Sequence, residues 1–223
     1  MGLGRASKVT IIGQGSSNGV IIPVDGVTRD ARSDGGFVGR VCPDKGVPTP
    51  LAATELLTDQ HIGASLLLVG PEEPSWTEGP AGYFAQALSG SLDPQFVRWT
   101  GPVKNPTTRY EQMDLLCLPT LRVGFFNVVL EAAVCRVLTV ASRVTGCFDD
   151  VIDNETGLLF TSTDPVDLAD KLSRLELDRI EFARVNRDAH SRAAKEFRRE
   201  TVWERTRIAF LAEIARRSEK GKI

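Results

Sequence analysis

The chain has 223 residues, 42% of them apolar, so it can fill the core of one large domain or two small ones. This apolar content argues against a disordered protein. The formal net charge is −2 at pH 7 and the sequence pI is near 5.8, which argues against a nucleic acid as the partner.

Strands and helices alternate along the sequence. Short apolar runs, each predicted to be a strand, occupy residues 8–12, 35–41, 65–70, 96–101, 114–119, 137–142 and 157–160. Helices are predicted for residues 50–60, 80–88, 106–113, 127–135 and 164–175, followed by a helix-rich tail from about Arg179. This alternation predicts an α/β fold with a doubly wound, Rossmann-like parallel sheet that helices cover on both faces.

The two ends of the chain fit this scheme less well. The stretch after the first strand is rich in Gly, Ser and Asp, which is typical of a linker, so we expect that strand to belong to a different structural unit from the sheet that starts at Gly36. The tail carries apolar residues at helical spacing: Val202, Trp203, Ala209, Phe210 and Ile214. These residues need a covering surface, which this chain need not contain.

The tail is also basic, with ten Lys and Arg against five Asp and Glu from Arg192 onward. A solvated helix face is the favoured interpretation of this surplus. A surface toward acidic lipid or toward another domain is the alternative.

Four cysteines and two histidines are scattered along the chain: Cys42, Cys117, Cys135, Cys147, His61 and His190. No two cysteines form a C-x-x-C pair, which argues against a zinc site and a disulfide framework and favours a reducing compartment. No apolar run approaches the roughly 18 residues of a membrane span, and the first residues lack an apolar signal core. We therefore expect a cytoplasmic protein.

Two cations follow the second predicted strand. Arg40 lies at the carboxyl end of this strand, and Lys45 follows five residues later across a turn formed by Pro43, Asp44 and Gly46. In a doubly wound sheet, ligands bind in the crevice outside the carboxyl ends of the strands. A guanidinium and an ammonium at that place suit a diphosphate, although the spacing alone favours two surface cations beside a turn.

The stretch LRVGFFNVVLEAA leads from the strand 114–119 into the helix 127–135. Gly124 allows the backbone to approach a ligand closely, and Asn127 is predicted to cap the helix. The first N–H groups of the helix then point into the crevice of the two cations and form an anion site. Glu131, one turn further, could accept hydrogen bonds from a ribose diol, although this motif alone favours an exposed helix glutamate.

Taken in chain order, several motifs resemble one family. They are GQGSSNGV, FVGRVCPDKG, LLLVGPEEP, VRWTGPVKNPTTRYEQMDLLCLPT, GFFNVVLEAA and VTGCFDDVIDNETGLLF. Together they resemble the C-terminal, donor-binding half of the retaining glycosyltransferases of family 4 (group 1), which have the GT-B fold. The resemblance covers roughly residues 8–197 and is strongest with bacterial enzymes that build capsule, O-antigen or other polysaccharide on a lipid carrier.

This resemblance implies a role for each matching residue. Arg40 and Lys45 match the pair that holds the donor diphosphate, and Glu131 matches the second glutamate of the E-x7-E motif, which binds the ribose. The positions that lie against the nucleotide sugar match Gly124, Phe125, Asn127, Val128, Val129 and Val103, the last of these near the nucleobase. The family implies a nucleotide sugar as substrate, and neither a bound metal nor another cofactor.

Other positions depart from the family's pattern. Val123 replaces the first glutamate of E-x7-E, so one charged hydrogen bond to the sugar is lost, at a cost of about 1.5–3 kcal/mol. Phe126 stands where a proline is usual, and Arg136 and Leu138 replace the usual glycine and proline of the next turn.

Three aspartates and one tyrosine are expected to have structural roles and not to act in catalysis. Asp149 and Asp150 are predicted to start a short helix, where acidic residues complement the dipole. Tyr110 and Asp114 are interpreted as packing and turn residues.

The family's two-domain organisation predicts the parts of the chain. Residues 1–20 hold the last strand of an otherwise missing N-terminal acceptor domain, 21–35 form a linker, 36–198 form the donor-binding domain, and 199–223 form a helix that crosses to the N-terminal domain. The implied partners are that missing domain or a partner subunit, and peripheral contact with the inner face of the membrane is an alternative for the basic tail.

The predicted activity is transfer of a hexose from a nucleotide sugar to a glycan or lipid-linked acceptor, with retention of the anomeric configuration. We expect the nucleotide sugar to be UDP-linked. The alternative is a non-catalytic, degenerate or truncated nucleotide-sugar binding or interaction module. A nucleotide-sugar epimerase of the same fold is a third, weaker hypothesis, because neither histidine lies in a recognisable catalytic cluster.

Overall fold

The structure is a computed structural model that describes residues 33–72, 96–104, 107–121, 127–144, 147, 151–197 and 199–220. Within these residues six strands form one sheet in the order β3-β2-β1-β4-β5-β6, and every neighbouring pair is parallel. The strands are β1 (Ser33–Val38), β2 (Ala64–Val69), β3 (Val97–Trp99), β4 (Leu115–Leu118), β5 (Leu138–Ser142) and β6 (Leu158–Phe160). The predicted α/β, doubly wound fold is confirmed.

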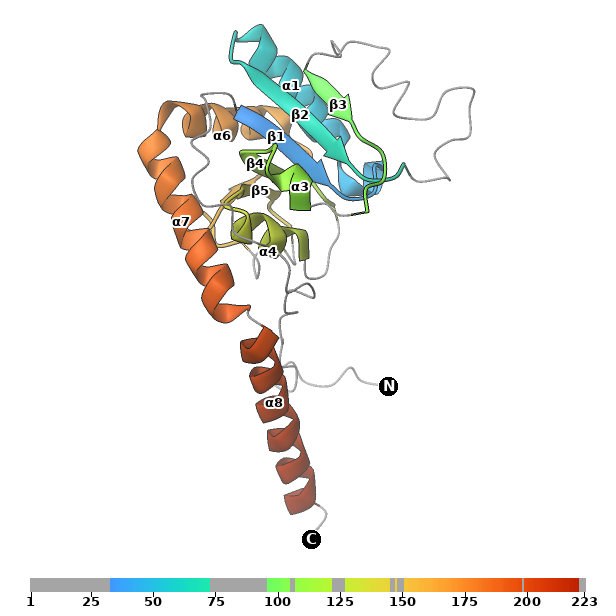
Figure 1. The fold of residues 1–223 in the computed structure, drawn as a ribbon, viewed down its shortest axis with the longest axis vertical. Coiled ribbons are helices and arrows are strands. Elements are labelled where there is room, and N and C mark those ends of the chain that lie inside the picture. Colours follow the sequence, from blue (N-terminus) through green and yellow to red (C-terminus); the bar gives the residue numbers. More distant parts are fainter. Residues whose placement is uncertain are drawn as a thin grey trace.

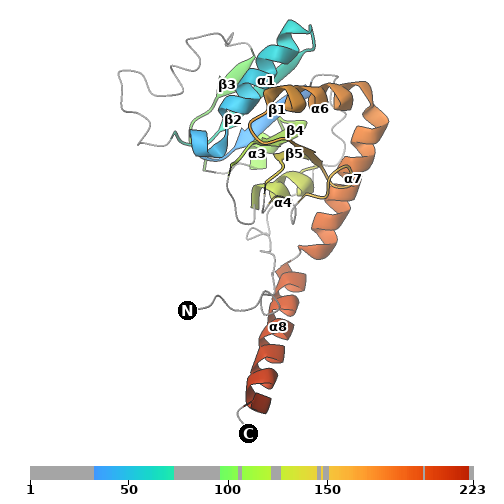
Figure 2. The ribbon, with the colours of Figure 1, turned by 180° about the vertical axis from the view of Figure 1, so that it is seen from behind.

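The helices of the described ranges connect and extend these strands (Figure 1). They are the 3-10 helix η2 (Pro43–Lys45), α1 (Pro48–Asp59), α3 (Thr107–Tyr110), α4 (Asn127–Val134), α6 (Pro165–Leu177), α7 (Arg179–Glu196) and α8 (Arg199–Lys220). Helices α1 and α6 lie on one face of the sheet and α3 and α4 on the other, as the view from behind also shows (Figure 2).

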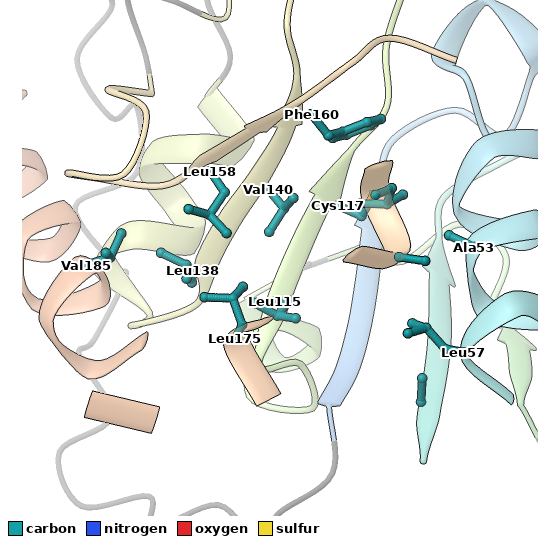
Figure 3. Packing of buried hydrophobic residues seen from close by; sticks show 13 residues of the cluster. Ala53, Leu57, Leu115, Cys117, Leu138, Val140, Leu158, Phe160, Leu175 and Val185 are labelled. Carbon is teal, nitrogen blue, oxygen red and sulfur yellow. The ribbon is translucent and has the colours of Figure 1, made fainter. Parts of the chain in front are cut away.

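The strands are apolar on both sides because both faces are covered, and successive side chains point to opposite faces. In β4, Leu115 and Cys117 join the cluster under α1 and α6, whereas Leu116 joins the cluster under α3 and α4. Figure 3 shows the first cluster, with Ala53 and Leu57 of α1 against the strands. The continuous apolar runs of the sequence are therefore explained by burial from both sides.

The bounds of β1 and α3 depart most clearly from the prediction. Strand β1 begins at Ser33, within the segment predicted to be a linker, and ends at Val38, because its register with β2 runs from Ser33↔Ala64 to Val38↔Val69. Arg40 therefore lies beyond the strand and does not end it. Helix α3 ends at Tyr110 and does not reach residue 113, since the carbonyls of Arg109 and Tyr110 accept turn hydrogen bonds that lead directly into β4. The predicted strand 8–12 and helix 80–88 lie outside the described residues.

The predicted helix-rich tail consists of α7 and α8. Helix α7 packs beside α4, whereas α8 projects away from the sheet (Figures 1 and 2). Trp203, Phe210 and Ile214 on α8 are 69%, 66% and 58% exposed, so the predicted uncovered apolar face is confirmed. No helix in the described part of the chain is long and apolar enough to cross a membrane.

Candidate functional site

The sheet order reverses between β1 and β4. The chain runs outward from β1 through β2 to β3, and then returns to place β4 on the other side of β1. Such a reversal is the topological switch point of an open α/β sheet, and ligands bind outside the carboxyl ends of its two strands. The segments that leave β1 and β4 therefore define the candidate site.

These two segments are tied together directly. The backbone N–H of Leu121, after β4, donates to the carbonyl of Asp44 in η2 at 3.3 Å. Gly46 has φ 68°, and a Cβ there would lie 1.9 Å from the carbonyl oxygen of Pro119. Only glycine fits this turn without displacing the exit of β4. Helix η2, which ends at Lys45, is thus held against the start of the loop that leads to α4.

The two predicted cations both follow β1 at this edge. Arg40 is exposed and lies two residues beyond the strand, while Lys45 is half-buried at the end of η2. In the described ranges, the Lys45 side chain forms no hydrogen bond or ion pair. Its ammonium is therefore available to an anion at the switch point.

Helix α4 begins at Asn127, as the sequence predicted, but Asn127 does not cap it through its side chain. Asn127 is already helical, and its Oδ1 is buried without a hydrogen-bond partner among the described residues. An N-cap residue must instead precede the first helical residue, with its side-chain oxygen accepting from the N–H groups ahead. The predicted cap was wrong, and a buried acceptor is left open at the start of α4.

Glu131 lies on α4 one turn after Asn127, and positions i and i+4 share one face of a helix. It is half-buried, and its Oε2 accepts a hydrogen bond from the Tyr110 hydroxyl at 3.0 Å. Burial raises the pKa of the Tyr110 hydroxyl far above its ordinary value, and the nearby Glu131 carboxylate raises it further. Tyr110 is 1% exposed, which confirms its predicted packing role.

The hydrogen bond of Tyr110 to Glu131 was missed by the sequence analysis. The two residues are 21 positions apart and lie on different helices. Neither belongs to a local motif that would indicate the pair, so the bond became visible only when the fold placed α3 against α4.

The predicted valines lie in two different environments. Val103 and Val128 are half-buried, and each packs against the cluster that contains Tyr110 and Met113. Val129 is 4% exposed and packs in the core, so its backbone N–H, and not its side chain, is left for a ligand. Val103 and Val128 are thus on the Tyr110 side of the sheet.

Other predicted site residues lie outside the described part of the chain. They are Gly124 and Phe125, together with the departures at Val123 and Phe126 and the acidic pair Asp149 and Asp150. Their roles stay predictions.

Comparison with known proteins decides the family. Residues 32–178 match the family model described as glycosyl transferases group 1. The chain belongs to this glycosyltransferase family. This confirms the resemblance found in the sequence motifs.

Three similar proteins place the chain within the glycosyltransferases. The capsular polysaccharide biosynthesis glycosyltransferase CapM of Staphylococcus aureus is 26% identical over 91% of this chain and 55% of its own length. Alr3699/HepE of Anabaena, solved with UDP, aligns with a TM-score of 0.74 at 19% identity over 82% of this chain and 49% of its own. The C-terminal domain of the group 1 glycosyltransferase LpcC from Francisella tularensis aligns with a TM-score of 0.66 at 16% identity, over 74% of this chain and 86% of that domain.

The coverage of these proteins is itself informative. The chain spans about half the length of CapM and of HepE, but the match includes most of the LpcC C-terminal domain. The described sheet therefore has the fold of the C-terminal domain of LpcC.

Helix α4 ends at Val134, and the turn that follows contains Arg136, where the family usually has glycine. Arg136 has φ 58°, and the N–H groups of Arg136 and Val137 donate to the carbonyls of Ala133 and Ala132. This is a Schellman cap, whose left-handed residue favours glycine. Asn186 of α7 donates to the Arg136 carbonyl at 2.7 Å and helps to hold this turn.

No group of three or more His, Cys, Asp and Glu side chains in the described ranges is arranged to hold a metal ion. All four cysteines are buried free thiols, and burial raises the pKa of the Cys117 thiol to about 12.

Proposed function

We propose that this chain is the donor-binding half of a hexosyltransferase and that it binds a UDP-linked sugar at the β1/β4 switch point. The observation that carries the proposal is the attachment of η2 to the exit of β4 through Asp44 and Leu121. This attachment holds η2, which ends at Lys45, against Leu121 at the exit of β4. An ammonium and the N–H groups of a helix start suit the two phosphates of a nucleotide sugar.

The proposed chemistry is electrostatic. When the bond between the sugar and the diphosphate breaks, negative charge develops on the leaving nucleoside diphosphate. Arg40, Lys45 and the positive end of the α4 dipole would stabilise this charge without a metal ion. The sugar would then pass to a glycan or lipid-linked acceptor with retention of configuration.

The nucleoside would be recognised by apolar and carboxylate contacts. Glu131 would accept hydrogen bonds from the ribose hydroxyls, and Val103 would lie near the base. Alr3699/HepE was solved with UDP and with UDP-glucose, which supports a uridine nucleotide in this chain as well.

The acceptor would bind to a second domain. The chain spans about half of its relatives, and α8 presents the exposed side chains of Trp203, Phe210 and Ile214. We propose that an N-terminal domain or a partner subunit covers this apolar face and completes the cleft between the two halves.

A non-catalytic binding module is the second candidate, and Val123 is the observation that favours it. A valine cannot accept the sugar hydroxyl that the first glutamate of E-x7-E would accept. Hexose transfer on mixing this chain with an acceptor half would support the enzyme. Nucleotide-sugar binding without transfer in the same mixture would support the module.

Calorimetric titration of the purified chain with UDP, GDP and UDP-N-acetylglucosamine tests the proposed site. We expect micromolar binding of the uridine nucleotides and a loss of at least about tenfold in Lys45→Ala, because a charge-assisted bond to phosphate is removed. Lys171→Ala, which removes an ammonium from the middle of α6, is the matched control and should bind as the wild-type chain does. Absence of binding in a folded, monodisperse sample would refute the proposal.

A further inference from the structure

The hydrogen bond between Tyr110 and Glu131 joins a core residue to the proposed ribose-binding carboxylate. The Tyr110 ring is 1% exposed and packs with Leu67, Met113 and Leu116 in the core under α3 and α4. Its hydroxyl reaches Glu131 Oε2 at 3.0 Å. Packing therefore fixes the position of the Tyr110 hydroxyl. Its partner, the Glu131 carboxylate, belongs to a half-buried side chain at the candidate site.

The direction of this hydrogen bond is settled by the protonation states. A carboxylate can only accept, so the Tyr110 hydroxyl donates. Burial and the adjacent Glu131 both disfavour a tyrosinate, so the donor proton stays on Tyr110.

The same bond leaves one carboxylate oxygen of Glu131 available to a ligand. Oε2 is committed to Tyr110, whereas Oε1 accepts no hydrogen bond from the part of the chain that the structure describes. A glutamate side chain has several rotatable bonds, and ordering it on binding costs free energy. A hydrogen bond to a packed tyrosine removes part of that cost before the ligand arrives.

We infer that Tyr110 is a positioning residue that holds Glu131 in the orientation required to accept hydrogen bonds from a ribose diol. This inference rests on the proposed function. Tyr110 acts through Glu131 and does not touch the nucleotide itself.

The test compares two nucleotides in one variant. Tyr110→Phe removes the hydroxyl and keeps the packed ring. By calorimetry it should weaken UDP binding about fivefold, which corresponds to one hydrogen bond of ordinary strength. It should leave the affinity for 2′,3′-dideoxyuridine 5′-diphosphate unchanged, because that nucleotide offers Glu131 no hydroxyl. In a Glu131→Ala background, Tyr110→Phe should cause no further loss of UDP affinity.

A matched control separates positioning from general loss of stability. Thr54→Val also removes one buried hydroxyl, which donates to the Pro50 carbonyl at 2.8 Å on α1, and it should leave UDP binding unchanged. Thermal unfolding of both variants checks that each is folded at the titration temperature.

Three results would overturn the inference. If Tyr110→Phe lowered the affinity for UDP and for the dideoxy nucleotide equally, Tyr110 would have a structural role alone. If the affinity for UDP did not change, Tyr110 would have no role in binding. In either case, a loss of UDP binding in Lys45→Ala would leave the proposed function standing. Failure of the folded wild-type chain to bind UDP would overturn the proposed function and the inference together.

Discussion

Arg136 shows at the scale of one residue how a departure from the family pattern is accommodated. Its φ of 58° is in the left-handed region, where a Cβ costs about 1–2 kcal/mol. We expect Arg136→Gly to be more stable than Arg136→Ala by about 0.5–1 kcal/mol, because glycine relieves this strain but loses more entropy on folding. Urea unfolding of the two variants measures the difference, and the alanine variant controls for loss of the arginine side chain. Equal stability would contradict the cap geometry.

Asp167 provides a pH-dependent test at the same scale. The backbone N–H of Thr161 donates to Asp167 Oδ2, and this holds the pKa of the carboxyl below its ordinary value of 3.8. A depressed pKa contributes stability that is fully present above 3.8 and is lost as the pH falls through the lower value of the folded protein.

Asp167→Ala should therefore cost about 0.5 kcal/mol at pH 7, because solvent screens this exposed hydrogen bond, and progressively less below pH 3.8. Denaturant unfolding at several pH values provides the comparison. Asp170→Ala, which changes an exposed carboxylate on the same helix, is the control and should have a smaller effect at pH 7. A cost for Asp167→Ala that does not change with pH would show that the carboxylate charge contributes nothing.

The candidate site could be predicted in part from single residues. Lys45 was placed at the ligand-binding edge because the carboxyl ends of parallel strands share one edge, and this rule needs no coordinates. The side-chain cap at Asn127 was predicted incorrectly, since the sequence does not fix which residue is the first to become helical. The bond between Tyr110 and Glu131 depends on the packing of two helices, which no local pattern encodes.

At the scale of elements, adjacent glycines of β1 should respond oppositely to the same substitution. A Cβ on Gly35 would be 3.4 Å from the Ser65 carbonyl oxygen and would point toward a pocket beside α1. A Cβ on Gly36 would lie 2.0 Å from Sδ of Met113, which is fully buried. The two residues face opposite sides of the sheet.

We expect Gly35→Ala to stabilise the protein by about 0.5–1 kcal/mol, because alanine loses less entropy in a strand. Gly36→Ala should destabilise it by about 1–3 kcal/mol through overpacking. Each variant serves as the control for the other in thermal or urea unfolding. The same sign of effect at both positions would contradict the orientation of β1.

Element types were predicted better than their boundaries. Buried runs such as Leu115–Leu118 are long enough and apolar enough to identify a strand without tertiary information. The start of β1 at Ser33 was missed because Gly, Ser and Asp are typical of linkers, whereas the strand is defined by its register with β2.

At the scale of the whole molecule, α8 is the part least supported by the sheet. It projects beyond α7, and Trp203 and Phe210 are largely exposed (Figures 1 and 2). A helix with few buried contacts opens at low free-energy cost. We expect amide hydrogens of α8 to exchange much faster than those of α7, measured by mass spectrometry on the same sample. Addition of an acceptor half should slow exchange in α8 alone, and equal protection of α7 and α8 in the monomer would contradict this account.

The glycosyltransferase family and the fold could be predicted from the motifs, because the motifs follow one another in a characteristic order along the chain. The other half of the relatives' length could not be characterised in this way, since the chain spans about half of CapM and of HepE.

An NMR titration of the isotope-labelled chain with UDP tests the central claim most directly. Our account predicts chemical-shift changes concentrated at the backbone amides of Arg40, Lys45, Val103, Asn127 and Glu131, on the segments that follow β1, β3 and β4. Changes confined to the far edge of the sheet, or none in a folded sample at saturating UDP, would contradict it.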